Sequence, residues 1–130
     1  MWAGGRWATT GVVVRSAFLS AHQATVKRFL AGLVDSVTSI RSNPAAAQVT
    51  ANKQLATLSG GKALPAGVLA SSFRNVAYTT DPLASTYATQ ARHAEQVGLL
   101  RDPGPLGPMF DLRPLDAVLD AKGQQEVEGP

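Results

Sequence analysis

The stretch WAGGRWATTGVVVRSAFLSAH, residues 2–22, carries the most information about the fold of this chain. A glycine doublet precedes Val12-Val13-Val14, a β-branched run that is typical of a short buried strand. Ser16 to Ser20 can form one helical turn, and a long amphipathic pattern begins after His22. We expect a turn, a strand and a helix here. This order is typical of the interior of a domain, so we predict that the chain is the C-terminal part of a longer protein.

The rest of the chain predicts a mostly α fold with one or two short strands. Apolar residues recur at steps of three and four from Val26 to Ile40, which indicates a helix with one apolar face. Asn43-Pro44 and Asp81-Pro82 each place a capping side chain before a proline that suits a first helical turn. The expected elements are a strand at about 9–15, helices at about 23–41, 44–58, 65–74, 82–97 and 113–122, an extended piece at 76–79, and a disordered acidic tail at 123–130.

Composition limits the chain to one domain and narrows its chemistry. The chain has 130 residues, of which 45% are apolar, and it has no cysteine. Disulfides, thiolate metal sites and a cysteine nucleophile are therefore excluded. No apolar run approaches the ~20 residues that span a bilayer. A charged segment followed by an apolar one, as in a signal peptide, is also missing from the sequence as given.

Charge is distributed unevenly along the sequence. Residues 1–80 carry eight Lys or Arg and one acid, Asp35, whereas residues 81–130 carry four Lys or Arg and eight acids. A basic half can indicate a nucleic-acid partner. Here the cations are scattered singly, with only Lys27-Arg28 adjacent, so we expect no nucleic-acid binding.

The reactive side chains do not form a recognisable catalytic or metal site. His22 and His93 fall in different expected helices without a carboxylate at ligand spacing, so we expect no metal. Asp116 and Asp120 stand one helical turn apart near an acidic end, which is typical of a solvated face. Trp2 and Trp7 flank the glycine turn and suit either a cleft or the end of a core. The sequence predicts no catalytic residue and no cofactor.

Six short motifs nevertheless occur in one order. The first motif begins with Trp2 and Gly4-Gly5-Arg6-Trp7-Ala8-Thr9-Thr10. It continues through the valine run to Phe18-Leu19-x-x-His22. The later motifs are Asn43-Pro44-Ala-Ala-Ala-Gln, Lys62-Ala-Leu-Pro65 followed by Val68-Leu69-Ala70, Val76-Ala-Tyr-Thr-Thr-Asp81-Pro82-Leu83-Ala84-Ser85, Gly98-Leu99-Leu100, and Phe110-Asp111-Leu112-Arg113-Pro114-Leu115. Over about residues 2–120 the chain resembles the C-terminal part of periplasmic substrate-binding proteins of ABC importers for aliphatic sulfonates, taurine and nitrate. One departure is Gln23, where that family usually has proline.

The resemblance implies a type II periplasmic binding protein, in which two α/β lobes joined by a hinge enclose the ligand. Residues 1–122 would be the C-terminal part of lobe 1, with the N-terminal portion and the second lobe missing. The implied partners are a small anionic solute (an alkanesulfonate, taurine or nitrate) and an ABC permease. The implied ligand residues near the hinge are Arg6, Trp7, Thr9 and Thr10, because a guanidinium suits an oxyanion.

The resemblance also carries expectations about location and behaviour. The parent protein would be periplasmic or held outside the cytoplasmic membrane, whereas this chain, lacking a signal peptide, would be cytoplasmic if translated as given. The apolar stripe from Val26 to Ile40 would pack on a sheet that is missing. We therefore expect the chain to expose that stripe and to self-associate.

Other hypotheses stay open from the sequence. The chain can be a helical remnant of such a protein without an independent function. Pyrimidine-precursor synthases of thiamine biosynthesis share the same architecture, but their chemistry needs a site that bears histidine and cysteine, and this chain has no cysteine. A small basic helical module for interaction or nucleic-acid binding is a further alternative, motivated by residues 1–80.

Overall fold

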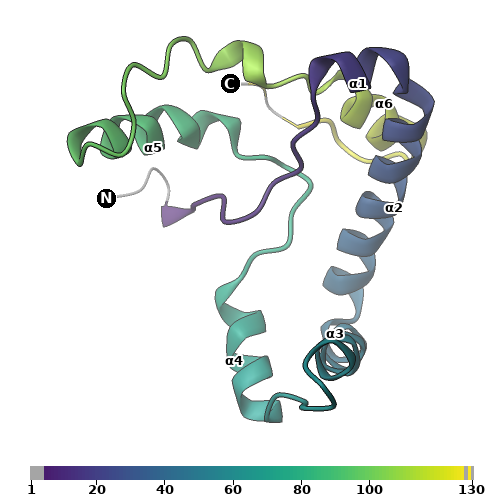
Figure 1. Cartoon of the computed structure of the whole chain (residues 1–130). Coiled ribbons are helices and arrows are strands. Elements are labelled where there is room, and N and C mark those ends of the chain that lie inside the picture. The colour runs from purple at the N-terminus through teal and green to yellow at the C-terminus, as the bar shows by residue number, and fades with distance from the viewer. Residues whose placement is uncertain (1–4, 128, 130) are drawn as a thin grey trace. The chain divides into compact units, whose positions relative to one another are not determined.

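The computed structural model describes residues 5–127 and 129, and it is mostly helical (Figure 1). Each expected helix lies within two residues of its predicted bounds. The helical elements are α1 (Ser16–Ala21), α2 (Gln23–Ser42), α3 (Pro44–Leu58), α4 (Ala66–Asn75), α5 (Ala84–Gln96), the short 3-10 helix η2 (Gly107–Met109) and α6 (Arg113–Ala121).

The chain divides into two compact units, and α2 runs from one into the other. The first unit holds the residues up to Ala31 and those from Asp81 onward, and the second unit holds Gly32–Thr80. None of the helices in the described part is both long enough and apolar enough to cross a membrane.

The strand expected at about 9–15 is wrong: residues 6–15 form neither helix nor strand, and the described residues contain no strand at all. Residues 76–79, expected as an extended piece, form neither helix nor strand, and Val76 has extended backbone angles. A strand needs a neighbour to pair its backbone N–H and C=O groups. No described segment pairs with residues 9–15, and the side chains of Val12, Val13 and Val14 are 50%, 94% and 37% exposed.

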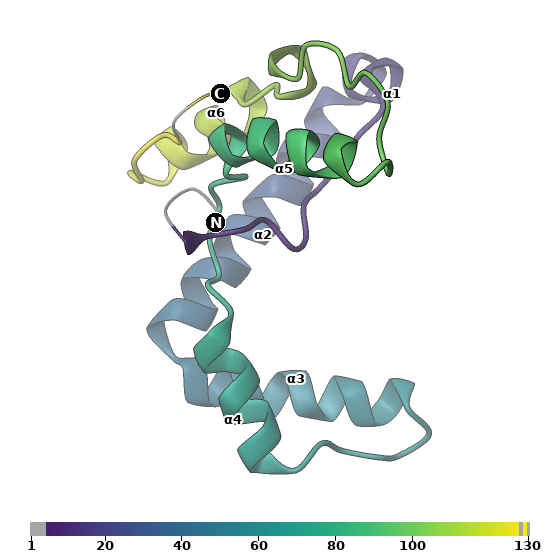
Figure 2. The same ribbon diagram turned by 90° about the vertical axis from the view of Figure 1, so that its left-hand side faces the viewer.

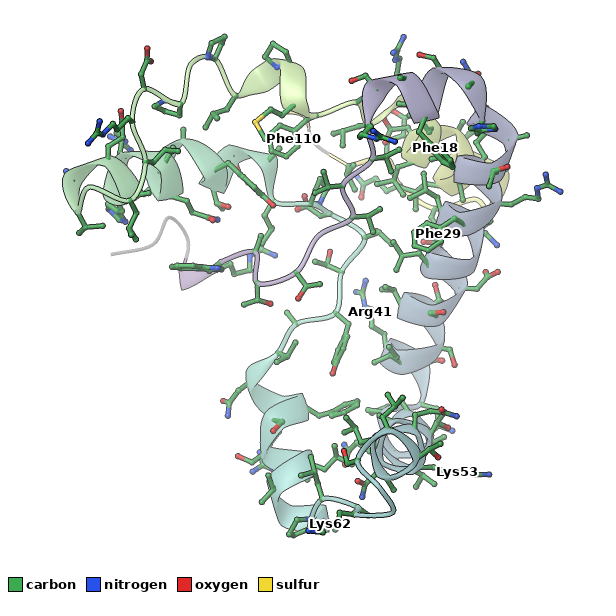
Figure 3. All side chains as sticks on the ribbon, in the orientation of Figure 1. Phe18, Phe29, Arg41, Lys53, Lys62 and Phe110 are labelled. Carbon is green, nitrogen blue, oxygen red and sulfur yellow. The ribbon has the colours of Figure 1, made fainter. Side chains whose placement is uncertain are left out.

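More of the side chains on the apolar face of α2 are buried than the sequence predicted. Val26 and Val37 are buried, and Val34, which the predicted stripe did not include, is fully buried. Leu30 is half-buried, and Phe29 remains more than half exposed (Figure 3). The expectation that the stripe is exposed is therefore wrong for most of it, because Phe29 is the one apolar residue of the stripe that is exposed.

The α1–α2 junction is a single residue. His22 donates its backbone N–H to the carbonyl of Phe18 at 2.9 Å, which ends α1, and its own carbonyl accepts from Thr25 and Val26 at 3.0 and 3.1 Å, which begins α2. Its ring lies 4.6 Å from the ring of Phe18. The histidine is thus occupied in local structure, as a packing role predicts.

Within the second unit, α3 begins and ends as its sequence predicts. The Asn43 side chain accepts a hydrogen bond from the backbone N–H of Ala46 at 3.1 Å, which caps the first turn. Gly60 has φ +66°, in the left-handed region that favours glycine, and Gly61 donates its N–H to the carbonyl of Ala56 at 2.7 Å. The chain therefore turns sharply away from α3.

One asparagine fastens the loop that follows α3 to that helix. The Asn52 side chain donates to the Leu64 carbonyl at 2.9 Å and accepts from the Leu64 N–H at 2.8 Å. The Asn52 amide bonds to both backbone groups of Leu64, as a paired backbone segment would. It therefore fixes a loop residue that lies twelve positions further along the sequence. The loop leads directly into α4, which packs on α3 (Figure 2).

In the first unit, the start of α5 departs from the prediction. Asp81 does not cap the helix: its carboxylate accepts from the Leu83 N–H at 2.7 Å, two residues on. Leu83 is held in the left-handed conformation (φ 55°, ψ 43°), and the helix begins at Ala84. A local side-chain bond therefore competes with helix formation and delays it by two residues.

The core of the first unit depends on α6. Leu115, Val118 and Leu119 recur at helical spacing and are all buried, and Leu119 is only 1% exposed. After the helix, Gln124 donates its N–H to the Leu119 carbonyl at 2.9 Å, and Val127 donates to the Asp116 carboxylate at 3.4 Å. The described residues of the 123–130 segment form no helix or strand, and disorder there stays a prediction.

Truncating the most buried leucine should destabilise the fold strongly. We expect Leu119→Ala to lower the free energy of unfolding by about 2–5 kcal/mol, because it removes methyl groups and leaves a cavity. Leu58, which is 83% exposed, provides the matched control. Leu58→Ala should change the free energy of unfolding by less than about 0.5 kcal/mol. Urea unfolding followed by circular dichroism at 222 nm measures both, and equal effects would contradict the burial of Leu119.

Removing the Asn52 clamp should loosen the loop without unfolding the helices. Asn52→Ala deletes two exposed hydrogen bonds, and we expect it to lower the free energy of unfolding by about 1 kcal/mol. Amide hydrogen exchange at Leu64 should accelerate. Asn75→Ala, which deletes a bond within one helix to the Ser71 carbonyl, should leave Leu64 exchange unchanged. Unaltered exchange in Asn52→Ala would show that the clamp does not hold the loop.

Candidate functional site

Of the four residues that the resemblance implied as ligand-binding, only Trp7 lines one of the described cavities. Arg6, Thr9 and Thr10 are exposed, and none of them lines a described cavity. Trp7 is 47% exposed and lies at the wall of an apolar groove. Trp2, the other tryptophan of the opening motif, and Gly4 lie outside the described residues.

The groove belongs entirely to the first unit and has a volume of about 620 Å³. One wall is α5, which contributes Tyr87, Ala91 and Ala94. After the helix ends, the chain returns over α5 (Figure 1). Residues of that returning segment form the opposite wall, and Trp7 completes the lining. The lining residues from that returning segment are Leu99, Leu100, Pro103, Leu106 and Met109.

Local backbone chemistry builds the returning wall. Gly98 has φ +74° and donates its N–H to the Glu95 carbonyl at 2.9 Å, which ends the helical path. Leu99 and Leu100 both donate to the Ala94 carbonyl, at 2.8 and 3.2 Å. These bonds satisfy the free carbonyls of the last turn and fix the direction in which the two leucines leave the helix.

An aromatic contact fastens the far end of the returning segment to α5. The rings of Tyr87 and Phe110 meet edge to face, with centroids 5.0 Å apart. Figure 3 labels Phe110. A Cβ placed on Gly11 would lie 3.6 Å from the Tyr87 hydroxyl, so the irregular N-terminal segment also passes close to this tyrosine. Tyr87 is therefore the residue on which three segments of the first unit converge.

The groove is suited to apolar groups and not to a small anion. No Lys, Arg, Asp or Glu occurs among its described lining residues; Gln90, His93 and the Tyr87 hydroxyl supply its polar groups. An oxyanion site needs charged or N–H donors that converge on the oxygen atoms. Arg6, the cation that the resemblance implied, lies outside this lining.

An exposed ion pair lies at the start of α6. The Arg113 guanidinium donates to both carboxylate oxygens of Asp111, at 2.8 and 2.7 Å. These hydrogen bonds lower the pKa of Asp111 below its ordinary value and raise the pKa of Arg113. The Arg113 side chain is 89% exposed, so the pair contributes little to stability.

The other reactive side chains do not converge. The described part of the chain contains no cluster of three His, Asp or Glu placed to hold a metal ion. His22 is packed on Phe18, and His93 lines the apolar groove. Asp116 accepts a backbone N–H from Val127, and Asp120 is exposed.

The sequence predicts the helix that forms one wall of the groove, but not the groove itself. The spacing of Tyr87, Ala91, Ala94 and Val97 predicts a buried helix face; the structure shows the first three half-buried and Val97 69% exposed. Leu106 and Met109 gave no such signal, because a Pro- and Gly-rich segment has no periodicity from which to infer which side chains gather.

No family model, no curated protein and no solved structure matches this chain.

Replacing Arg113 should release the Asp111 carboxyl. In Arg113→Gln we expect the pKa of Asp111 to rise toward 3.8, its ordinary value. In the wild type the pair stabilises the fold above that value, and this small contribution is lost as pH falls through the lowered pKa. Carbon-detected NMR titration measures the shift. Arg101→Gln serves as the control, and an Asp111 pKa that is identical in all three proteins would contradict the ion pair.

Proposed function

We propose that this chain forms part of a solute-binding protein of an ABC importer, of the kind that captures a small sulfonate, taurine or nitrate. The proposal rests on the six ordered motifs between residues 2 and 120. The observation that carries it in the structure is the valine run Val12–Val14, which has strand composition but is exposed and unpaired. Such a run suits a sheet contributed by other parts of a larger protein.

The polar residues just before that run are suited to an anion. Arg6 offers a guanidinium with paired N–H donors, and the hydroxyls of Thr9 and Thr10 add two more donors within five residues. All three side chains are exposed, so a ligand can reach them without displacing packed structure. The apolar groove, which lacks a Lys or Arg, is not part of this proposed site.

The isolated chain should bind such anions weakly. A binding cleft encloses most of its ligand, and a few exposed donors do not. We expect a Kd on the order of 1 mM, which corresponds to about −4 kcal/mol. In the proposed whole protein, the permease would be the membrane partner and the second lobe would complete the enclosure.

NMR titration of the chain with ethanesulfonate, taurine and nitrate tests this proposal. We expect the backbone amides of residues 6–10 to shift with the sulfonates or nitrate beyond the shift caused by chloride at equal ionic strength. Arg6→Gln should abolish the selective shift. The matched control is Arg74→Gln, which removes another exposed arginine, in the second unit, and should leave the shift intact.

Two results would contradict the anion site. One is a response to chloride as large as that to the sulfonates, taurine and nitrate. The other is an unchanged selective shift in Arg6→Gln. Circular dichroism of both variants establishes that the helices are retained.

A further inference from the structure

We propose that the ligand of the anion site is an arenesulfonate, whose sulfonate group lies against Arg6, Thr9 and Thr10 and whose aromatic ring enters the apolar groove of the first unit. This inference rests on the proposed function and names the ligand class that the site selects. It separates a sulfonate on an aromatic ring from taurine, from nitrate and from short alkanesulfonates. The groove is outside the anion site itself and holds the ring that carries the anion.

The segment that carries the three donors meets the groove at two points. Trp7 lines the groove directly. Further along, a Cβ placed on Gly11 would lie 3.6 Å from the hydroxyl of Tyr87, which is itself a lining residue. The two threonines lie between these points, and Arg6 is the residue next to Trp7. The segment therefore runs along the edge of the groove, within the first unit.

Covalent geometry keeps the donors close to that edge. A chain spans at most about 3.6 Å per residue, so the path from Trp7 to Gly11 is at most about 14 Å long. Each donor is within two residues of a groove contact, which places its Cα within about 7 Å of the Cα of Trp7 or Gly11. One ligand can therefore meet the donors with its head and the groove with its ring.

The lining of the groove determines which part of a ligand it accepts. Its volume of about 620 Å³ is within the range of roughly 300–1,000 Å³ that small-molecule sites occupy. The described lining residues include no Lys, Arg, Asp or Glu. A charged group placed there would lose its hydration without gaining an ion pair. The ammonium of taurine is therefore disfavoured in the groove, and nitrate has no group to place in it.

Two aromatic side chains favour a flat ring over a flexible alkyl chain. Trp7 and Tyr87 both line the groove, and the contact with Phe110 holds the Tyr87 ring in place. Aromatic rings gain from stacked or edge-to-face contact beyond the area that they bury. A rigid ring also loses less conformational entropy on binding than an alkyl chain of similar size.

The opposite wall is formed before a ligand binds. The N–H groups of Leu99 and Leu100 bond to the Ala94 carbonyl at 2.8 and 3.2 Å, which fixes the backbone at the start of that wall. The side chains of Leu99 and Met109 are 84% and 68% exposed, so a ring in the groove removes their apolar surface from water. That burial favours binding in proportion to the apolar area covered.

NMR titration of the full chain with four probes tests the inference. Naphthalene-2-sulfonate carries a ring and an anion, ethanesulfonate an anion without a ring, naphthalen-2-ol a ring without an anion, and octane-1-sulfonate an alkyl chain with the same anion. We expect naphthalene-2-sulfonate to bind at least tenfold more tightly than each of the other three. It should shift the backbone amides of residues 6–10 and those of residues 87–100, whereas ethanesulfonate should shift residues 6–10 alone.

A double substitution in the opposite wall separates binding of the ring from binding of the anion. Leu99→Ser, Met109→Ser removes apolar contacts and should reduce the preference for naphthalene-2-sulfonate over ethanesulfonate at least fivefold. The matched control is Val49→Ser, Leu58→Ser, whose residues lie in the second unit and are 71% and 83% exposed. It should keep the preference of the wild type. Circular dichroism establishes that both variants retain their helices.

Several results would overturn the ring assignment while leaving the anion site in place. They are equal affinities for naphthalene-2-sulfonate and ethanesulfonate, tighter binding of octane-1-sulfonate, and a preference that persists in the groove variant or is lost equally in its control. Binding of naphthalen-2-ol as tight as that of naphthalene-2-sulfonate would also overturn it, because the ring would then bind without the anion. If no sulfonate shifts residues 6–10 in a manner that requires Arg6, the proposed function fails and this inference fails with it.

Discussion

Backbone hydrogen bonding is the constraint on which this structure depends. A helix pairs its N–H and C=O groups within its own segment, whereas a strand pairs them with a neighbour. This chain supplies many helical segments and no described neighbour for its valine run. The helices therefore form at the predicted places, and residues 6–15 remain irregular although Val12–Val14 have strand composition.

The parts of the fold that were predictable from sequence are those decided locally. Asn43 and Gly60 bracket α3 because each acts on backbone groups within a few residues. The start of α5 was not predicted correctly, although its Asp81-Pro82 signal looks the same as the Asn43-Pro44 signal. The Asp81 carboxylate accepts the N–H of Leu83, which precedes the helix, and the residue types alone do not predict this bond.

The candidate site was less predictable, because it depends on which segments meet. Trp7 was named from its place beside a glycine turn, but the resemblance assigned it to an anion site, and the structure places it in an apolar wall. The periodicity of α2 predicted its apolar face without showing what covers it. Val34 was not predicted to lie on that face, although it is fully buried. Burial is a property of neighbours distant in sequence, and residue spacing does not report it.

The junction at His22 limits how this chain can vary in length. One residue ends α1 and begins α2, so no linker separates the two helices. An inserted or deleted residue there would rotate one helix about 100° relative to the other and turn its apolar face away from the core. Length variation is better tolerated between Arg101 and Pro105, where the chain forms neither helix nor strand.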